Sequence, residues 1–279
     1  MTSDRPVALV TGAAGGIGAA IARRLAADGF EVVVHARHSV VAGRALAGEL
    51  RGRFVQADLT DDAQRTSLIA AVGGRLDVLV NNAGQSGVVP HTDLDAATPE
   101  LWHALYDVNV VAPFRLVAAA AGLLRAGPNG CVVNISSHAG VRPKGASIPY
   151  AASKAALNHV TRLLALSLAP GIRVNAIAPG LVDTPLTAGW DEARRVWQER
   201  SPMRRGAAPE EVAEVAAMLV RSVYITGEVI VLDGGLNLTQ AIAALRAVHN
   251  YCSLANPLFV LRECSPGGGD HERTDHQLS

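Results

Sequence analysis

The fold is decided by the stretch Val7-Ala8-Leu9-Val10-Thr11-Gly12-Ala13-Ala14-Gly15-Gly16-Ile17-Gly18. Its first four residues form an apolar run without alternation, which indicates a strand covered on both faces. Gly12, Gly16 and Gly18 then allow a sharp turn and a close approach of the backbone to a pyrophosphate. The helix expected from Ile17 offers unpaired N–H groups and a partial positive charge to the phosphates. This order of strand, turn and helix favours a nucleotide-binding unit over an ordinary structural loop.

The same alternation continues along most of the chain. Further strands are expected at 31–34, 76–80, 131–135, 173–177 and 228–232, and helical patterns at 17–27, 99–125, 150–168 and 209–220. This rhythm predicts an α/β fold: a Rossmann-like, doubly wound parallel sheet of about seven strands with helices on both faces.

Two regions differ in pattern. Residues 1–236 are predicted to form a single dinucleotide-binding catalytic domain, and 237–279 a C-terminal extension. Apolar residues at helical spacing predict one helix over 238–251, and the polar, glycine-rich end is predicted to be disordered. That extension would pack on its own subunit or on a neighbour, or would have no function.

Composition excludes several classes of protein. Of the 279 residues, 49% are hydrophobic and 18% charged, so a largely disordered chain is excluded. The 25 basic and 25 acidic residues balance and form no basic stripe, which argues against a nucleic-acid partner. No signal-peptide pattern or long uncharged apolar run is found, so we expect a cytoplasmic protein without a membrane helix. Three scattered cysteines and unclustered histidines predict no disulfide framework and no metal site.

The end of the second strand, His35-Ala36-Arg37-His38, bears on which nucleotide binds. NAD-binding folds of this kind usually carry an acid here that bonds the ribose 2′-hydroxyl. No acid stands at this place, and Glu31 lies too early to replace it. Arg37 would instead pair with a 2′-phosphate, so NADP(H) is favoured and NAD(H) is the alternative. The other interpretation of Arg37 is a solvated surface side chain.

Tyr150-Ala151-Ala152-Ser153-Lys154 opens a helical pattern and predicts an acid–base pair. The i, i+4 spacing puts the phenol and the ammonium on one helix face. A nearby ammonium is expected to lower the pKa of Tyr150, which would make it a proton donor and acceptor near neutral pH. Alone, this spacing also fits a half-buried tyrosine beside a surface lysine.

Other motifs end or follow the expected strands, except for Asn109, which falls in the helical pattern over 99–125. They are Asn81-Asn82-Ala83-Gly84, Asn109 within Asp107-Val108-Asn109-Val110, Asn134-Ile135-Ser136-Ser137, Pro179-Gly180 and Asp183-Thr184. Together with the glycine-rich turn and the Tyr150–Lys154 pair, they closely resemble the short-chain dehydrogenase/reductase superfamily in its single-domain branch. The resemblance runs from about Pro6 to Leu236 and is greatest to 3-oxoacyl-thioester reductases of fatty-acid and polyketide pathways.

The resemblance implies a role for each matching residue. Tyr150 would protonate the carbonyl oxygen, Lys154 would bond the nicotinamide ribose and tune Tyr150, and Ser137 would hold the substrate oxygen. Asn109 would support a proton relay through water. With Arg37, the implied cofactor-binding set is Gly12, Gly16, Ile17, Gly18, Asp58, Leu59, Asn82, Ala83, Gly84, Tyr150, Lys154, Pro179, Gly180, Val182 and Thr184.

The substrate-contacting residues are harder to predict, because they lie in loops. His138 follows Ser137 and would border the substrate, or would be an ordinary polar loop residue. Trp190 and Trp197 share a face if 190–199 is helical, and would line an apolar lid or pack on their own core. A carrier-protein substrate calls for a basic patch, and Arg125 and Arg162 make only a thin one.

Three functions are compatible with these residues. The first is an NADP(H)-dependent reductase that turns a ketone into a secondary alcohol with Tyr150 as proton donor. The second is an NAD-dependent secondary-alcohol or sugar dehydrogenase, and the third a non-catalytic nucleotide-binding regulator. The apolar helical patterns near 100–125 and 150–168 and the family resemblance predict a homo-oligomer, a tetramer or dimer.

Overall fold

The computed structural model describes residues 5–239. Its strands are β1 (Val7–Val10), β2 (Glu31–Ala36), β3 (Arg53–Gln56), β4 (Val78–Asn81), β5 (Gly130–Ile135), β6 (Ile172–Pro179) and β7 (Val229–Leu232). Its α-helices are α1 (Gly16–Ala27), α2 (Val40–Glu49), α3 (Asp62–Val72), α4 (Pro99–Tyr106), α5 (Ala112–Ala126), α6 (Ile148–Leu168), α7 (Asp191–Arg200) and α8 (Pro209–Arg221). Short helical turns are η1 (Asp107–Val111, π-helical), η2 (His138–Gly140) and η3 (Pro185–Thr187).

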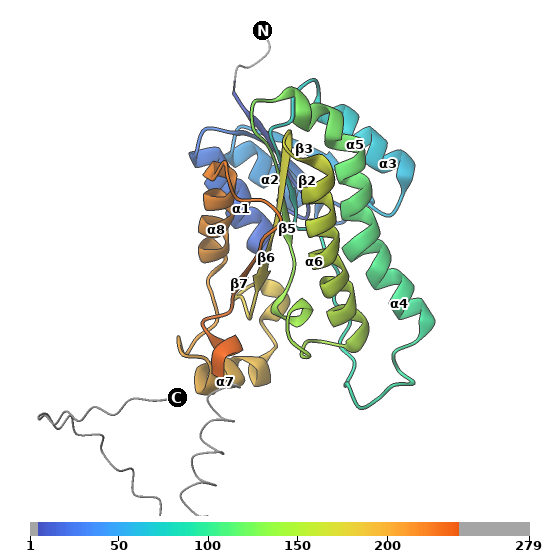
Figure 1. Cartoon of the computed structure of the whole chain (residues 1–279), viewed down its shortest axis with the longest axis vertical. Helices are drawn as coiled ribbons and strands as arrows, with labels where there is room; N and C mark the ends of the chain where they lie inside the picture. Colours follow the sequence, from blue (N-terminus) through green and yellow to red (C-terminus); the bar gives the residue numbers. More distant parts are fainter. Residues whose placement is uncertain (1–4, 240–279) are drawn as a thin grey trace, which may run out of the picture. The chain divides into compact units, whose positions relative to one another are not determined.

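Within this part of the chain, one seven-stranded sheet has the order β3-β2-β1-β4-β5-β6-β7, with every neighbouring pair parallel. Helices α1, α2 and α8 cover one face, and α3, α5 and α6 cover the other (Figure 1). The predicted Rossmann-like, doubly wound α/β fold is confirmed. The helix expected over 238–251 lies outside the described residues, so the boundary after residue 236 stays a prediction.

Alternate residues of the strands face opposite hydrophobic layers. In β1, Ala8 and Val10 pack with α1 and α8, whereas Val7 and Leu9 pack with α3 and α5. Helices cover both faces of this strand, so none of its side chains faces solvent. Every position is therefore apolar, and the usual alternation of apolar and polar residues is absent. The sheet therefore forms a rigid partition between two cores.

Three elements were missed by the sequence analysis: β3, α2 and α3. The edge strand β3 reads Arg53-Phe54-Val55-Gln56, so polar residues interrupt the apolar run that marks the central strands. The helix α3 is largely polar on its outer face, and its N-cap is Asp61, whose carboxylate accepts a hydrogen bond from the N–H of Gln64. These three elements lie toward one edge of the sheet, and their apolar residues repeat too weakly to predict a strand or a helix.

The single helix expected over 99–125 is divided by the π-helical turn η1. Pro113 lies four residues after Asn109 and has no N–H, so it cannot give the carbonyl of Asn109 its α-helical partner. The register shift places Asn109 inside the protein, where it is buried. The run Pro99–Ala126 is also long and apolar enough to span a membrane by length and composition. Its residues Ala112, Leu116, Val117, Ala120 and Leu124 are buried in the core, as in a helix that covers a sheet.

A chain of buried polar side chains fastens three elements together. Asn81 Nδ2 donates to Asn134 Oδ1 (2.8 Å), Asn134 Nδ2 donates to Thr161 Oγ1 (2.9 Å), and Thr161 Oγ1 donates to the carbonyl of Leu157. Asn81 ends β4, Asn134 lies in β5, and Thr161 lies in α6. The chain fixes the relative position of three elements without using a flexible loop.

We expect Asn134→Ala to lower the free energy of unfolding by about 2–4 kcal/mol, because it leaves Asn81 Nδ2 buried without its acceptor and Thr161 Oγ1 without its donor. Chemical denaturation monitored by circular dichroism measures this change. Thr161→Val removes the bonds at one end of the chain, to Asn134 and to the carbonyl of Leu157, but keeps the bond between Asn81 and Asn134; it is the matched comparison, with a smaller expected loss of about 1–2 kcal/mol. Equal losses in the two variants would contradict a chain that depends on its central member.

Candidate active site

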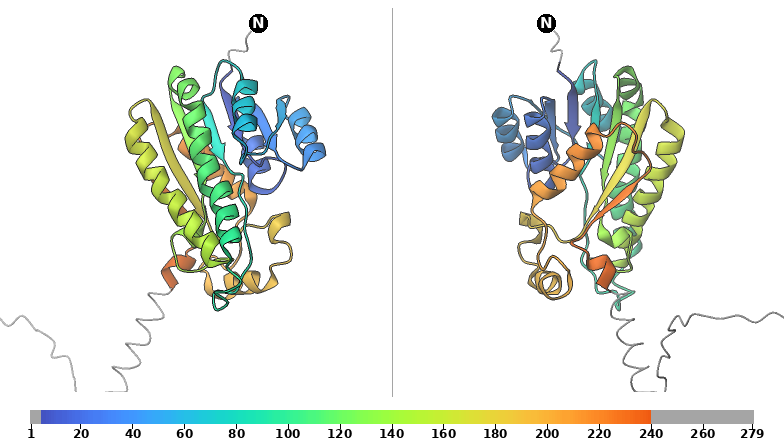
Figure 2. Two further views of the ribbon diagram at one scale, coloured as in Figure 1. Left: turned by 90° about the vertical axis from the view of Figure 1, so that its right-hand side faces the viewer. Right: turned by 60° about the vertical axis from the view of Figure 1, so that its left-hand side comes forward.

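The predicted site residues gather at the carboxyl ends of the strands, where the strand order reverses between β1 and β4. In an open α/β sheet, ligands bind in the crevice at this reversal. The segments after β1, β4, β5 and β6 all lie at this end, together with α7 (Figure 2), and Ser137 follows β5. Segments far apart in the sequence therefore build one site.

The glycine-rich turn is held against the end of β4. Thr11 Oγ1 accepts hydrogen bonds from the N–H groups of Asn82 and Ala83, each at 3.0 Å. Asn82 Nδ2 donates back to the carbonyls of Thr11 (2.9 Å) and Gly12 (3.0 Å). A Cβ on Gly18 would lie 2.4 Å from Asn82 Nδ2 and 2.5 Å from the oxygen of Gly12, so only glycine fits there. Gly12 adopts φ +61°, which glycine tolerates.

The start of α1 fits the phosphates of a dinucleotide. Its N-cap, Gly15, provides no side-chain hydrogen bond, and the first turn carries no acidic residue. The N–H groups of Gly16, Ile17 and Gly18 are thus left by the helix without partners, as anion binding requires. Thr184 lies over this turn, since a Cβ on Gly16 would be 3.3 Å from its Cγ2. The donors and the open backbone match the expected pyrophosphate site.

His35 supports this turn, a role that sequence reasoning did not assign. The imidazole is buried; its Nδ1 accepts from the N–H of Gly12 (3.3 Å), and its Nε2 lies 3.0 Å from the carbonyl of Ala57. Burial lowers the pKa of His35. The ring is therefore neutral, with Nε2–H as donor and Nδ1 as acceptor.

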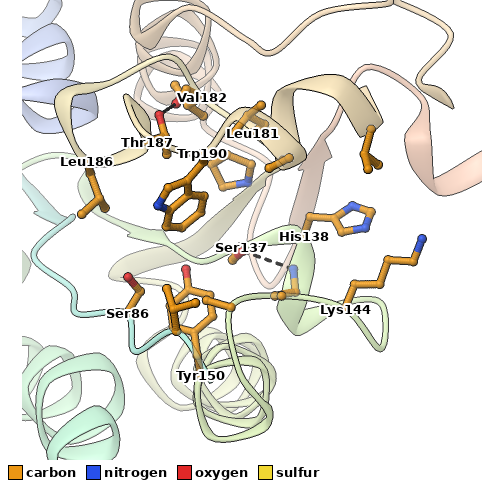
Figure 3. Close-up of a pocket in the computed structure, with 18 of the residues that line it drawn as sticks. Ser86, Ser137, His138, Lys144, Tyr150, Leu181, Val182, Leu186, Thr187 and Trp190 are labelled. Carbon is orange, nitrogen blue, oxygen red and sulfur yellow. Dashed lines mark hydrogen bonds between the residues drawn. The ribbon is translucent and has the colours of Figure 1, made fainter. Parts of the chain in front are cut away.

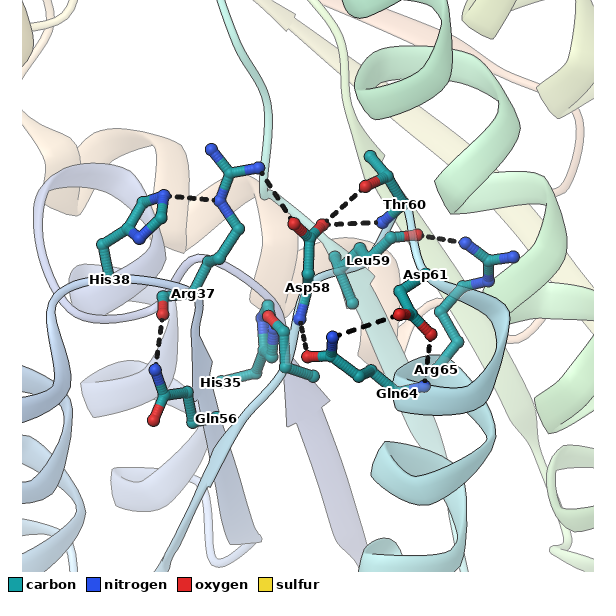
Figure 4. A network of polar contacts seen from close by, with 11 residues as sticks. His35, Arg37, His38, Gln56, Asp58, Leu59, Thr60, Asp61, Gln64 and Arg65 are labelled. Atoms are coloured by element: carbon teal, nitrogen blue, oxygen red, sulfur yellow. Dashed lines mark hydrogen bonds and ion pairs between the residues drawn. The ribbon is translucent and has the colours of Figure 1, made fainter.

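Arg37 and Asp58 lie together at the ends of β2 and β3 (Figure 4). Arg37 Nη1 is 3.3 Å from Asp58 Oδ2, and its Nε donates to His38 Nε2 at 2.7 Å. The hydroxyl and the N–H of Thr60 donate to Asp58 Oδ1. These bonds, led by the N–H of Thr60, lower the pKa of Asp58 despite its partial burial. The exposed guanidinium of Arg37 is thus held by His38 and Asp58. Leu59, which follows Asp58, is buried.

Ser137 and Tyr150 line the same cavity (Figure 3), and Lys154 follows Tyr150 by one turn on α6. Tyr150 enters from the first turn of α6, where the N-cap Ser147 accepts from its N–H. Ser137 and Tyr150 share a side-chain hydrogen bond. Lys154 Nζ donates to the carbonyl of Ile135 (2.9 Å) and lies 5.9 Å from the centre of the Tyr150 ring. Ser136, by contrast, donates to the carbonyl of Lys154 and so joins β5 to α6.

The sequence predicted that Lys154 would lower the pKa of Tyr150, and this prediction was wrong. Burial raises the pKa of Tyr150, and the bond with Ser137 opposes that rise only in part. Burial also lowers the pKa of Lys154 to about 8. Loss of water around both groups outweighs the attraction between ammonium and phenolate that the i, i+4 spacing suggested.

Asn109 is brought to the same place by the π-helical turn. Its Oδ1 accepts from the N–H of Gln85 (2.9 Å), and its Nδ2 donates to the carbonyl of Gln85 (2.9 Å) and to Ser153 Oγ (3.0 Å). Its side chain is thus engaged in fixing the segment after β4 to α6. Gly84 lies against it, because a Cβ there would be 3.1 Å from Asn109 Oδ1 and 3.4 Å from Lys154 Nζ.

The cavity measures about 700 Å³ and is mostly apolar. All three candidate substrate residues, His138, Trp190 and Trp197, line it. Trp190 is the N-cap of α7 and Trp197 lies in its last turns, so α7 covers the cavity. Gly180 packs against Trp197, with a Cβ there expected 2.8 Å from the indole ring. Pro179 and Val182, from the cofactor set, border the same cavity.

Sequence reasoning missed several residues that build this site. Thr11, Ser153 and Asp233 stand inside or beside the quoted motifs, yet their partners come from other elements. Leu186 and Ser86 also line the cavity, from segments without a motif. In residues 5–239, no group of three or more His, Cys, Asp or Glu side chains could hold a metal ion.

Known proteins match this chain over most of its length. A family model described as enoyl-(acyl carrier protein) reductase matches residues 12–237. A protein described as ketoacyl reductase 2 of the granaticin polyketide synthase of Streptomyces violaceoruber is 46% identical, over 84% of this chain and 97% of that protein. A short-chain dehydrogenase/reductase structure from Burkholderia xenovorans has a TM-score of 0.79 and 36% identity, over 85% of this chain and 100% of that chain. The 3-ketoacyl-(acyl-carrier-protein) reductase of Brucella melitensis, complexed with NADH, has a TM-score of 0.77 and 31% identity, over 83% and 98% of the two chains.

The chain belongs to the short-chain dehydrogenase/reductase superfamily. The resemblance inferred from the motifs is confirmed, and so is the class of enzyme: an NAD(P)-dependent oxidoreductase that interconverts CH–OH and C=O groups. Among its relatives are ketoacyl reductases. A nicotinamide dinucleotide fits the glycine cradle and free helix N–H groups described above.

We expect Gly18→Ala to weaken nicotinamide dinucleotide binding by about 10-fold or more, because the added Cβ displaces Asn82 and the turn it holds. Fluorescence titration with NADPH and NADH measures the two affinities. Gly48→Ala on α2 is the control, since its Cβ would meet nothing within 4 Å. Unchanged affinity in Gly18→Ala would contradict the tight fit of this turn.

Proposed function

We propose that this short-chain dehydrogenase/reductase is an NADP(H)-dependent ketoreductase that forms a secondary alcohol, with Tyr150 as the proton donor. The observation that carries the proposal is the pair Ser137 and Tyr150 lining a mostly apolar cavity, with the buried ammonium of Lys154 5.9 Å from the centre of the Tyr150 ring. The raised pKa of Tyr150 keeps the phenol protonated at neutral pH, as a donor in reduction must be.

The residues divide the work of the reaction. The reduced nicotinamide, when bound, supplies the hydride to the carbonyl carbon. Ser137 Oγ and Tyr150 Oη hold the carbonyl oxygen, and Tyr150 transfers its proton to that oxygen as negative charge develops there. The ammonium of Lys154, buried and weakly screened, stabilises the phenolate left on Tyr150. Trp190 and Trp197 exclude water from the reacting groups.

Arg37 supports NADP(H) over NAD(H). It is the cation at the end of β2, and the neighbouring Asp58 is already engaged by Thr60. A 2′-phosphate would receive charge-assisted hydrogen bonds from the guanidinium. The Brucella melitensis relative is complexed with NADH, which supports the alternative of an NAD-linked dehydrogenase. The cavity's apolar lining and the thin basic surface favour a free ring ketone over a carrier-bound chain.

The assembly and location belong to the same proposal. Phe114 on α5 and Leu163 and Leu166 on α6 are exposed apolar side chains on neighbouring helices. Such a face is buried when two copies associate, so a dimer or tetramer is proposed. A cytoplasmic location is proposed from the sequence pattern.

Tyr150→Phe tests the reaction. We expect NADPH-dependent reduction of cyclic and thioester ketones, followed by nicotinamide absorbance, to fall roughly 100- to 10,000-fold, because the proton donor is removed. In the native enzyme, the rate should decline as pH rises through about 8, since Lys154 is charged below that pKa and neutral above it.

Tyr106→Phe on α4, outside the cavity, is the matched control and should keep the native rate. Unchanged turnover in Tyr150→Phe would refute the mechanism. Cofactor binding measured in parallel separates loss of chemistry from loss of folding.

Arg37→Ala tests the cofactor preference. We expect the Kd for NADPH to rise about 10- to 100-fold while the Kd for NADH stays unchanged, because only the 2′-phosphate contact is lost. Calorimetric titration of both cofactors measures the difference. Arg44→Ala, an exposed arginine on α2, controls for the loss of one positive charge. Tighter native binding of NADH than of NADPH would overturn the preference.

A further inference from the structure

A buried imidazole–carboxylate pair lies in the cavity wall beside the reaction centre. His138 Nδ1 is 2.9 Å from Asp233 Oδ2, and the side chains are only 6% and 5% exposed. His138 opens η2 directly after Ser137, whereas Asp233 follows β7. No step of the reaction described above requires either residue.

The hydrogen bonds around Asp233 determine the tautomer of His138. Asp233 Oδ1 accepts from the N–H of Gly235 (3.0 Å), and Oδ2 accepts from the N–H of Asn237 (2.8 Å). A carboxylate that receives N–H donors is an acceptor only, so the proton between the two side chains belongs to His138 Nδ1. The other ring nitrogen, Nε2, then carries the lone pair when the ring is neutral. Burial lowers the pKa of His138 despite the opposing charge of Asp233, which favours that neutral ring.

The acceptor nitrogen is available to a ligand. The His138 side chain lines the cavity, and no residue within 5–239 bonds its Nε2. Trp197 packs edge-on against the imidazole, with ring centres 6.0 Å apart, so the ring is held by packing as well as by Asp233. Figure 3 shows His138 beyond Ser137, on the side of the cavity nearer Lys144. A fixed acceptor thus stands next to the residue that holds the carbonyl oxygen.

We propose that His138, oriented by Asp233, is a specificity-determining residue that accepts a hydrogen bond from a substrate hydroxyl group. The substrate class is a ring ketone that bears a hydroxyl besides its reacting carbonyl. The inference rests on the proposed ketone reduction and deepens it.

The ring follows from the rest of the cavity. Trp190, Leu186 and Val88 give it broad apolar walls, which suit a flat hydrocarbon skeleton. The hydroxyl follows from His138, because a buried acceptor left without a donor disfavours any ligand that lacks one. Ser137 and His138 are consecutive, so one short segment after β5 carries both the group that holds the carbonyl oxygen and the acceptor for the hydroxyl.

Paired substrates test this specificity. The substrates are β-tetralone, its positional hydroxy derivatives and the corresponding methoxy derivatives. At each position the methoxy compound keeps the oxygen but carries a methyl group in place of the donor hydrogen, and β-tetralone lacks both. We measure kcat/KM with NADPH, and binding in the presence of oxidised NADP from quenching of tryptophan fluorescence. The variants are His138→Phe, which keeps a ring without an acceptor, and His138→Gln, which can donate to Asp233 and present an oxygen to the cavity. His103→Phe, exposed on α4, is the matched control.

The native enzyme should favour at least one hydroxy ketone over its methoxy partner by about 10-fold or more. That ratio should fall to about 1 in His138→Phe, stay partly in His138→Gln, and remain native in His103→Phe. The ratio is unaffected by a general loss of folding, which lowers both rates together.

Turnover without hydroxyl preference, or a preference that survives His138→Phe, overturns this inference and leaves the proposed reaction intact. Hydroxyl-selective binding without turnover overturns the reaction and leaves the role of His138 intact. If the set shows no selective binding and no turnover, both the role of His138 and the proposed reaction are overturned.

Discussion

The site depends on how closely the chain can pass where the sheet reverses its strand order. There the turn after β1 meets the end of β4, and hydrogen bonds between Thr11 and Asn82 join them in both directions. A side chain at Gly18 would occupy the space of those bonds. The same approach leaves the first N–H groups of α1 pointing outward, so tight packing and phosphate binding have one physical cause.

Burial determines the chemistry of the next layer of residues. Lys154 is almost fully buried, and its ammonium is bonded to one backbone carbonyl, that of Ile135. Tyr150 is half-buried beside it, and loss of water around both groups holds each nearer its neutral form than it would be in water. In the proposed reaction, the neutral phenol gives up its proton only as negative charge develops on the carbonyl oxygen, and the amine beside it stabilises the phenolate. The rigid chain from Asn81 through Asn134 to Thr161 keeps the elements that carry them in register.

Sequence patterns predicted what short segments encode locally. The glycine turn, the central strands and the Tyr150–Lys154 spacing all act within a few residues, and the fold and family drawn from them are confirmed. The edge strand β3 escaped because its polar residues face solvent, and α2 and α3 because their apolar stripes are narrow. The pKa of Tyr150 was mispredicted because spacing reveals a neighbouring charge but not the loss of water around it. Asn109 bonds to Gln85 and Ser153. The sequence could not predict these partners, because they depend on the register shift at the π-helical turn η1.

The two halves of the site differ in what fixes them. The cofactor half uses backbone groups of β1, α1 and the segment after β4, and glycine is what such contacts require, so sequence motifs report it well. The substrate half is built from side chains after β5, β6 and β7, and each contact there joins residues far apart in the chain. The bond between His138 and Asp233 spans 95 positions. No local sequence pattern predicts such a pair, because the imidazole and the carboxylate meet only when the sheet places the ends of β5 and β7 near each other. Membership of the superfamily therefore carries the class of reaction, whereas the proposed choice of ketone rests on a few side chains that the fold brings together.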